Sequence, residues 1–144
     1  MYLQRFQKVV TGVRNQFPTS PWITTQQAED LLKSQQKVLL VDARLKDEFK
    51  VSKIPGAVNI PISSKAPEIK QKLIDAKACE NTKLITYCAI SVRSSMMLNK
   101  IQKLTGQDPD LKIEPENLLN MEGSIFKWAI ENRQLVDENG NSTK

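Results

Sequence analysis

Cys88 is the residue of this chain whose position most directly suggests chemistry. It follows the apolar run at residues 84–87, and a short loop leads from it into a helical pattern that starts near Ser94. A thiol between a strand end and a helix N-terminus lies where a thiolate is stable, because free amides and the helix dipole favour negative charge. The chain contains no histidine. A Cys–His pair is therefore excluded, and the loop itself must activate the sulfur.

The loop after Cys88 contains one charged residue, Arg93, among apolar and small neighbours. Successive backbone N–H groups in such a turn can form a concave anion site, and the following helix adds its dipole. Ser94 and Ser95 fall in the first helical turn, where hydroxyls can bind free amides. We expect Cys88 to be the nucleophile and Arg93 to contact an anion. The residues of this predicted anion-binding loop are Ala89, Ile90, Ser91, Val92, Arg93 and Ser94.

A parallel sheet is predicted to position these residues, because short apolar runs alternate with helical patterns. The predicted strands are residues 38–41, 58–60, 84–87 and 118–119. The predicted helices begin after a Thr24/Gln27 capping box and continue at residues 46–51, 67–76, 94–104 and 124–132. Active sites in such α/β folds lie at the carboxyl ends of strands, and Cys88 lies at such an end.

Apolar residues at helical spacing predict which helix faces are buried. In the helix at residues 67–76, we expect Ile69, Leu73 and Ile74 to face inward. In the helix at residues 94–104 the expected inward set is Met96, Met97, Ile101 and Leu104. In the last helix it is Ile125, Phe126 and Trp128.

The two ends of the chain differ from the rest. Residues 1–17 contain three basic residues and no acid, with apolar residues at helical spacing. This pattern fits a helix packed on the domain, but also a transit peptide or a membrane-surface helix. Prolines then indicate a linker that ends at residue 21. Residues 137–144 are polar and are predicted to form a flexible tail.

Composition narrows the classes of function. The net charge is +5, but the lysines are interleaved with acids, so nucleic-acid binding is not expected. No apolar run approaches the roughly 20 residues that span a bilayer. Cys79 and Cys88 are the only cysteines, which disfavours a disulfide framework and, without histidine, a zinc site. We expect no metal and no organic cofactor, and a reducing compartment.

Three groups of residues, in order along the chain, resemble the rhodanese-like domain family. The first is Asp42-Ala43-Arg44 with Glu48-Phe49 and residues 54–61. The second is the strand at residues 84–87 with Cys88 and Arg93-Ser94, and the third is residues 120–128. The resemblance extends over residues 22–136. It implies one domain with a three-layer α/β/α fold and a central, mostly parallel sheet of about five strands.

The resemblance implies sulfur transfer. In this family a cysteine thiolate takes the outer sulfur of a sulfane donor such as thiosulfate and holds it as a persulfide. A thiol or cyanide then removes that sulfur. For this chain the expected nucleophile and persulfide carrier is Cys88. We expect Asp42, Arg44 and Glu48 to have a supporting role, in an ion-pair network that braces the loop.

Loop length separates this reading from cysteine phosphatases and arsenate reductases. Phosphatases use a C-x5-R loop that wraps a tetrahedral phosphate, whereas four residues separate Cys88 from Arg93 here. The shorter loop is expected to fit a single sulfur. Many family members carry glycine where Ser91 stands, which permits a positive φ. A serine there costs about 1 kcal/mol and, with the apolar loop, favours the alternative of a non-catalytic interaction module.

The expected partners follow from the same reading. They are a small sulfur-containing anion or persulfide donor, and a thiol acceptor or a sulfur-carrier protein. We expect a monomer, without nucleic acid and without a membrane span. The expected location is the cytoplasm, or a mitochondrion or plastid if residues 1–20 act as a transit peptide.

Overall fold

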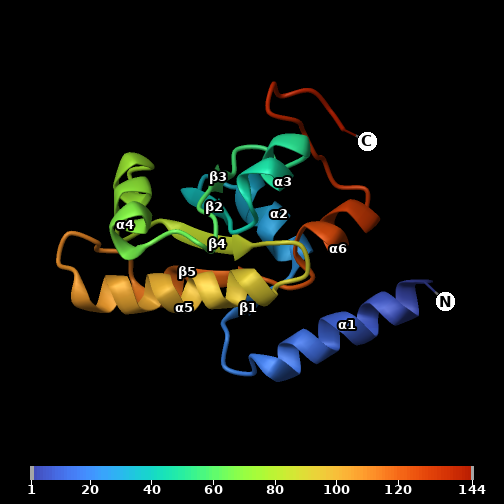
Figure 1. Ribbon diagram of the computed structural model, residues 1–144, viewed down its shortest axis with the longest axis horizontal. Helices are drawn as coiled ribbons and strands as arrows, with labels where there is room; N and C mark the ends of the chain where they lie inside the picture. The colour runs from blue at the N-terminus through green and yellow to red at the C-terminus, as the bar shows by residue number, and fades with distance from the viewer. Residues whose placement is uncertain (1, 144) are drawn as a thin grey trace.

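A five-stranded parallel sheet lies at the centre of the fold, with strand order β1-β5-β4-β2-β3 (Figure 1). The computed structural model describes residues 2–143, with side chains from Leu3 onward. Two residues lie outside the described residues: Met1, in the predicted N-terminal extension, and Lys144, in the predicted tail. The strands are β1 Trp22–Ile23, β2 Val38–Asp42, β3 Val58–Asn59, β4 Lys83–Tyr87 and β5 Leu118–Met121. All pairings between neighbouring strands are parallel, which confirms the predicted fold class.

The helices follow the predicted alternation. They are α1 Tyr2–Gln16, α2 Thr25–Lys33, α3 Lys46–Val51, α4 Ala66–Asp75, α5 Val92–Gln107 and α6 Ser124–Ile130, with a short 3-10 turn at Pro115–Asn117. The predicted capping box begins α2: the Thr24 hydroxyl accepts the Gln27 N–H, and the Gln27 side chain accepts the Thr24 N–H. Only β1 had no sequence signal, because two residues are too few to show a periodicity.

The sheet separates two apolar clusters, because side chains along a strand alternate between its faces. In β4, Leu84 packs in the cluster that also contains Ile69 of α4 and Ile101 of α5. Ile85 faces the opposite way, into the cluster that contains Trp128 of α6. Helices α4 and α5 therefore cover one face of the sheet, while α2 and α6 pack on the other.

Three predicted core residues are exposed. The exposed fraction is 42% for Ile74, 47% for Met96 and 47% for Phe126. In α4 the buried stripe is Ile69 and Leu73, which are four residues apart; Ile74 is one residue further and points about 100° away. The same displacement by one residue separates Met96 from the buried Met97. Helical spacing predicted these helices correctly, but the buried faces that it predicted are wider than those in the structure.

The N-terminal helix α1 packs on the domain. Its Val10 and Val13 are buried, the Arg14 guanidinium forms an ion pair of 3.0 Å with Glu122, and the ring of Phe6 lies 6.0 Å from that of Phe126. After Val136 the chain turns back on itself, so that the Thr143 N–H reaches the Leu135 carbonyl and an isolated bridge pairs residues 136 and 142. No helix among residues 2–143 is long and apolar enough to cross a membrane.

Candidate active site

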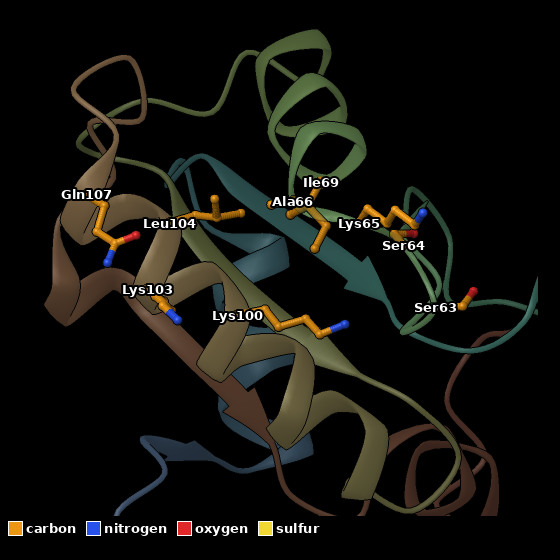
Figure 2. Close-up of a pocket in the computed structure, with 9 residues that line it drawn as sticks. All are labelled: Ser63, Ser64, Lys65, Ala66, Ile69, Lys100, Lys103, Leu104 and Gln107. Carbon is orange, nitrogen blue, oxygen red and sulfur yellow. The ribbon is translucent and has the colours of Figure 1, made fainter.

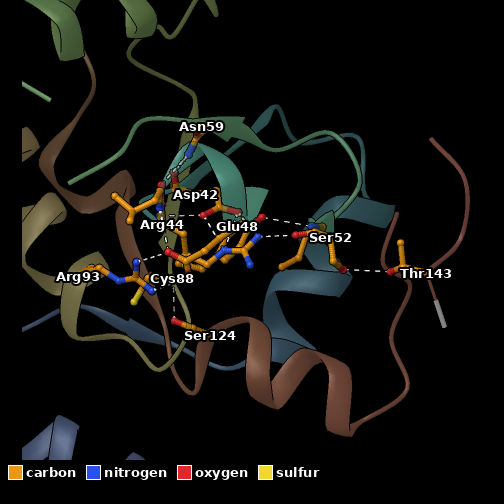
Figure 3. Close-up of polar contacts among 12 residues, drawn as sticks. Asp42, Arg44, Glu48, Ser52, Asn59, Cys88, Arg93, Ser124 and Thr143 are labelled. Carbon is orange, nitrogen blue, oxygen red and sulfur yellow. Dashed lines mark hydrogen bonds and ion pairs between the residues drawn. The ribbon is translucent and has the colours of Figure 1, made fainter. Parts of the chain in front are cut away.

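Cys88 lies directly after β4, at the carboxyl edge of the sheet (Figure 3). Its side chain is buried, with 1% of the residue exposed. The backbone N–H of Ser91 donates to the Cys88 sulfur across 3.1 Å. Helix α5 begins at the next residue, Val92. An amide donor and a helix N-terminus thus converge near the sulfur, where both stabilise negative charge.

The loop turns at Ser91, which adopts φ +79° and ψ +4°. This is the left-handed conformation that glycine adopts at least cost. The Ser91 hydroxyl donates to the Met121 carbonyl across 2.7 Å and lies 2.6 Å from the Ser124 hydroxyl. These contacts offset part of the backbone strain, since a polar group buried at this depth is costly unless it has partners.

Ser124 is a residue of the site that the sequence analysis did not single out. Its hydroxyl accepts the Cys88 N–H across 3.1 Å, and its own φ is +52°. Two further backbone bonds join the same segments: Ile125 N–H to the Cys88 carbonyl, and Phe126 N–H to the Ala89 carbonyl. The turn between β5 and α6 therefore holds the start of the Cys88 loop. Its sequence signal was the motif at residues 120–128, which carries no indication of this contact.

The sequence predicted that the hydroxyls of Ser94 and Ser95 would bind free backbone amides. In the structure, both hydroxyls instead donate hydrogen bonds to oxygen atoms. Ser95 donates to the Ser91 carbonyl across 2.6 Å, and Ser94 donates to the Asn120 side chain across 2.9 Å. Both serines are buried beneath the loop. The prediction was wrong because burial left them facing β5 and the preceding turn, where carbonyl acceptors are available. The amides at the start of α5 therefore remain without hydroxyl partners from these two residues.

Arg93 is held by Glu48. Its two terminal nitrogens lie 2.6 and 3.1 Å from the two carboxylate oxygens of Glu48, a bidentate pair. The hydrogen bond from Arg93 lowers the pKa of Glu48. The pKa of Arg93 is raised, chiefly by the hydrogen bond to Glu48 and also by the charge of that carboxylate. Figure 3 shows the Arg93 side chain next to Cys88, so the positive charge lies at the site although its donors are engaged.

Asp42 and Arg44 form a second, more deeply buried pair. The Asp42 carboxylate is fully buried and accepts the Arg44 guanidinium at 2.8 Å and the Arg44 backbone N–H at 2.9 Å. Burial alone would lower the pKa of Arg44, but the hydrogen bond and charge of Asp42 outweigh it and leave that pKa raised. Arg44 also donates to the Ser52 carbonyl, and Asn59 donates to the carbonyls of both Asp42 and Arg44. This pair fixes the segment between β2 and α3, which carries Glu48.

Cys79 does not lie beside Cys88. It precedes β4, whereas Cys88 follows it, so the two thiols are at opposite ends of a five-residue strand, about 17 Å long. Both cysteines are free. A resolving role for Cys79 is excluded by this separation. Its exposed thiol has a lowered pKa, chiefly because of the Thr82 hydroxyl.

An apolar cavity of about 410 Å³ lies beside the loop. Ile90 of the loop and Phe126 of α6 line one side, and Phe6 and Val9 of α1 line the other; Arg5 is the only charged residue among the described residues that line it. Helix α1 thus contributes directly to the surroundings of the Cys88 loop. Among the residues that the structure describes, no group of three Asp, Glu, Cys or His side chains could hold a metal ion.

Comparisons with known proteins bear on this arrangement. The family model of the rhodanese-like domain matches residues 24–131. A search of the curated proteins found no match. Among solved structures, a thiosulfate sulfurtransferase from Pseudomonas aeruginosa has 18% identity and a TM-score of 0.64, over 94% of this chain but only 24% of that one.

Two other solved structures are similar over nearly their whole length. A rhodanese-related protein from Thermoplasma volcanium has 24% identity and a TM-score of 0.60, covering 82% of this chain and 99% of that one. A human single-domain sulfurtransferase has 21% identity and a TM-score of 0.59, covering 78% and 97%. At such identities the likeness shows the fold. Because the family model matches most of the chain, this protein belongs to the rhodanese-like domain family.

Proposed function

We propose that this protein is a sulfurtransferase that carries a sulfane sulfur as a persulfide on Cys88. The observation that carries the proposal is the Ser91 N–H donated to the Cys88 sulfur at the N-terminus of α5. Amide donors at this position stabilise an anionic sulfur without a general base, which suits a chain without histidine. The solved sulfurtransferases of the same fold support the reaction class.

With thiosulfate as donor, the chemistry is two displacements at sulfur. The Cys88 thiolate attacks the outer sulfur and forms a new S–S bond, while the old S–S bond breaks and sulfite leaves with the electron pair. An acceptor thiolate or cyanide then attacks the terminal sulfur of the persulfide, and the Cys88 thiolate leaves. Sulfur oxidation states balance between the two steps, so no external oxidant and no cofactor are required.

We propose roles for the surrounding residues on the same basis. The amides from Ala89 to Ser94 form the anion cradle, and Arg93 adds positive charge beside the sulfur. Asp42, Arg44 and Glu48 support the site: the buried Asp42–Arg44 pair fixes the segment before α3, and Glu48 orients Arg93. The apolar cavity beside Ile90 is a suitable place for the non-polar part of a thiol or persulfide partner.

The direct test is mass spectrometry of the full chain after incubation with thiosulfate or with glutathione persulfide, together with thiocyanate formation in the presence of cyanide. We expect wild-type protein to gain the mass of one sulfur atom and Cys88→Ser to gain none. Cys79→Ser is the matched control, and it should behave like wild type. Absence of the adduct with both donors would refute sulfur transfer.

A non-catalytic interaction module is the second candidate, and a specific observation favours it. Cys88 is only 1% exposed and Arg93 is paired with Glu48, so both groups are engaged within the domain. On this alternative the fold persists and the loop is inert. Failure to form the sulfur adduct, with an intact fold by circular dichroism, would support it. Turnover of an aryl phosphate by wild type but not by Cys88→Ser would instead support a phosphatase.

A further inference from the structure

A second cavity, separate from the Cys88 loop, lies between the start of α4 and the second half of α5 (Figure 2). Its volume is about 440 Å³, within the range of cavities that hold small organic ligands. No residue of the loop from Cys88 to Ser94 lines it. Its lining includes Ser64, Lys65, Ile69, Lys100, Lys103 and Leu104.

The charge at this cavity is of one sign. Three lysines line it, and no acidic residue does. None of the three forms an ion pair with any of residues 2–143; only the Lys100 ammonium has a bond, to the Ile62 carbonyl at 2.8 Å. At the end of α5, Asp108 and Asp110 both pair with Lys70, whose single charge offsets one of their two. The three lysines that line the cavity thus have no carboxylate partner among residues 3–143, and their charge can attract an anion.

Ser64 contributes a hydroxyl to the cavity. Most of the residue is buried, with 5% exposed, and its hydroxyl forms no hydrogen bond with any part of the chain that the structure describes. No fully buried side-chain oxygen or nitrogen among the described residues lacks a partner, so the Ser64 oxygen reaches solvent, where it can bind a polar ligand. Ser64 lines the cavity just before the N-terminus of α4, where the Glu68 carboxylate already accepts the Lys65 N–H across 3.4 Å.

The opposite part of the cavity is apolar. Ile69 is 1% exposed and belongs to the core, and the partly buried Leu104 packs against the same cluster. Figure 2 shows both side chains between the two helices, with Lys65 beside Ser64 and with Lys100 and Lys103 extending from α5. An inorganic anion would leave this surface uncovered, whereas an organic anion would contact both regions.

We propose that this cavity binds a phosphate monoester with an apolar body. The body packs on Ile69 and Leu104, and the doubly charged phosphate is held by Lys100, Lys103 and the Ser64 hydroxyl. The site is independent of sulfur transfer, because it shares no residue with the Cys88 loop. Its occupant would nevertheless contact α5, the helix whose N-terminus lies at Cys88.

The test is calorimetric titration of the full chain carrying Cys88→Ser with 1-naphthyl phosphate. This background prevents turnover and separates the result from the fate of the sulfurtransferase proposal. We expect saturable binding that is at least tenfold tighter than that of inorganic phosphate or of 1-naphthol. Equal affinity for inorganic phosphate, or no saturable binding of the naphthyl ester, would overturn the proposal.

Variants locate the binding. Replacing both Lys100→Gln and Lys103→Gln should weaken binding about tenfold, since each exposed charge contributes a modest share. Lys103→Gln alone, which leaves the Lys100 bond to Ile62 intact, should weaken it by a few-fold, as should Ser64→Ala. Lys50→Gln, an exposed lysine on α3, is the matched control and should change nothing. Unchanged affinity in the double variant would place the ligand elsewhere and refute the assignment.

Discussion

Ser91 shows how a single residue sets the geometry at Cys88. The loop requires a positive φ at this position, and serine meets that requirement because its hydroxyl binds the Met121 carbonyl and the Ser124 hydroxyl. The side chain therefore has two opposite effects: its Cβ strains the backbone, and its hydroxyl anchors the loop to the turn before α6. Substitutions can separate these effects.

Ser91→Ala should lower the free energy of unfolding by about 1–3 kcal/mol, because it keeps the strain and leaves buried partners unsatisfied. Ser91→Gly should be more stable than Ser91→Ala by about 1 kcal/mol, because glycine removes the strain. Urea denaturation measures both. The matched control is Ser34, which also donates to a carbonyl but has φ −85°. At this position the glycine variant should not be more stable than the alanine variant. If Ser34→Gly is more stable than Ser34→Ala by the same margin, backbone strain does not cause the difference at Ser91.

The Glu48–Arg93 pair makes stability depend on pH in a defined direction. Arg93 lowers the pKa of folded Glu48 below its ordinary value of 4.5. A carboxyl with a lowered folded pKa stabilises the fold above its unfolded pKa, and this contribution disappears as pH falls through the folded value. Because both side chains are about one-third exposed, solvent screening limits the effect to about 1 kcal/mol or less.

We therefore expect wild type to exceed Glu48→Gln in unfolding free energy by up to about 1 kcal/mol at neutral pH. The difference should shrink as pH falls below 4.5. Chemical denaturation at a series of pH values measures it. Glu116→Gln, an exposed glutamate without an ion pair among the described residues, is the control and should show no such difference. A gap that stays constant down to the acid range would contradict the assignment.

At the scale of elements, α1 is part of the folded domain. Its buried Val10 and the Arg14–Glu122 ion pair attach it beside α6, and its Phe6 and Val9 complete the cavity next to Ile90. The amphipathic pattern of this segment is compatible with a membrane surface or an organelle import receptor. The packing contacts indicate that the domain itself covers the apolar face of α1.

Val10→Asp should detach α1 while leaving the sheet intact. The substitution removes the stabilisation of about 2 kcal/mol that burial of the valine side chain provides. It also places a charge at a buried position. We expect faster tryptic cleavage within residues 5–14 and unchanged strand content by circular dichroism. Leu3→Asp is the control, because Leu3 is 63% exposed, and it should alter neither measurement. Equal cleavage of the two variants would mean that Val10 does not hold α1 in place.

At the scale of the whole molecule, one sheet supports two apolar clusters and the two ion pairs at its carboxyl edge. The strand order β1-β5-β4-β2-β3 makes β4 the central strand, so Cys88 emerges from the middle of the edge with β2 and β5 on either side. Asp42 ends β2, and the turn that contains Ser124 follows β5. The loop is therefore braced from both neighbouring strands.

Because the clusters share the sheet, we expect them to unfold as one cooperative unit. Ile101→Ala on the α5 face and Ile85→Ala on the opposite face should each cost about 2–5 kcal/mol. Their double variant should be additive within about 0.5 kcal/mol. Ile74→Ala is the control, since that residue is 42% exposed, and should change stability by about 0.5 kcal/mol or less. Two separate transitions in urea would show that the faces unfold independently.

The amino-acid sequence by itself determined the alternation of strands and helices, the parallel sheet, and the place of Cys88 at a strand end. These features follow from local rules: apolar runs, helical spacing and a capping box each act within a few residues. The need for a positive φ at Ser91 was also visible, because its position in the loop could be compared with the family pattern.

Only the tertiary structure decided what each polar residue near Cys88 contacts. Arg93 points to Glu48, Ser94 and Ser95 turn to carbonyl-type acceptors beneath the loop, and Ser124 receives the Cys88 N–H. These contacts join residues that are up to 45 positions apart along the chain, and long-range geometry leaves no periodic trace in a sequence. Whether the sulfur meets a hydroxyl, an amide or a guanidinium depends on how β2, β4 and β5 are ordered in the sheet.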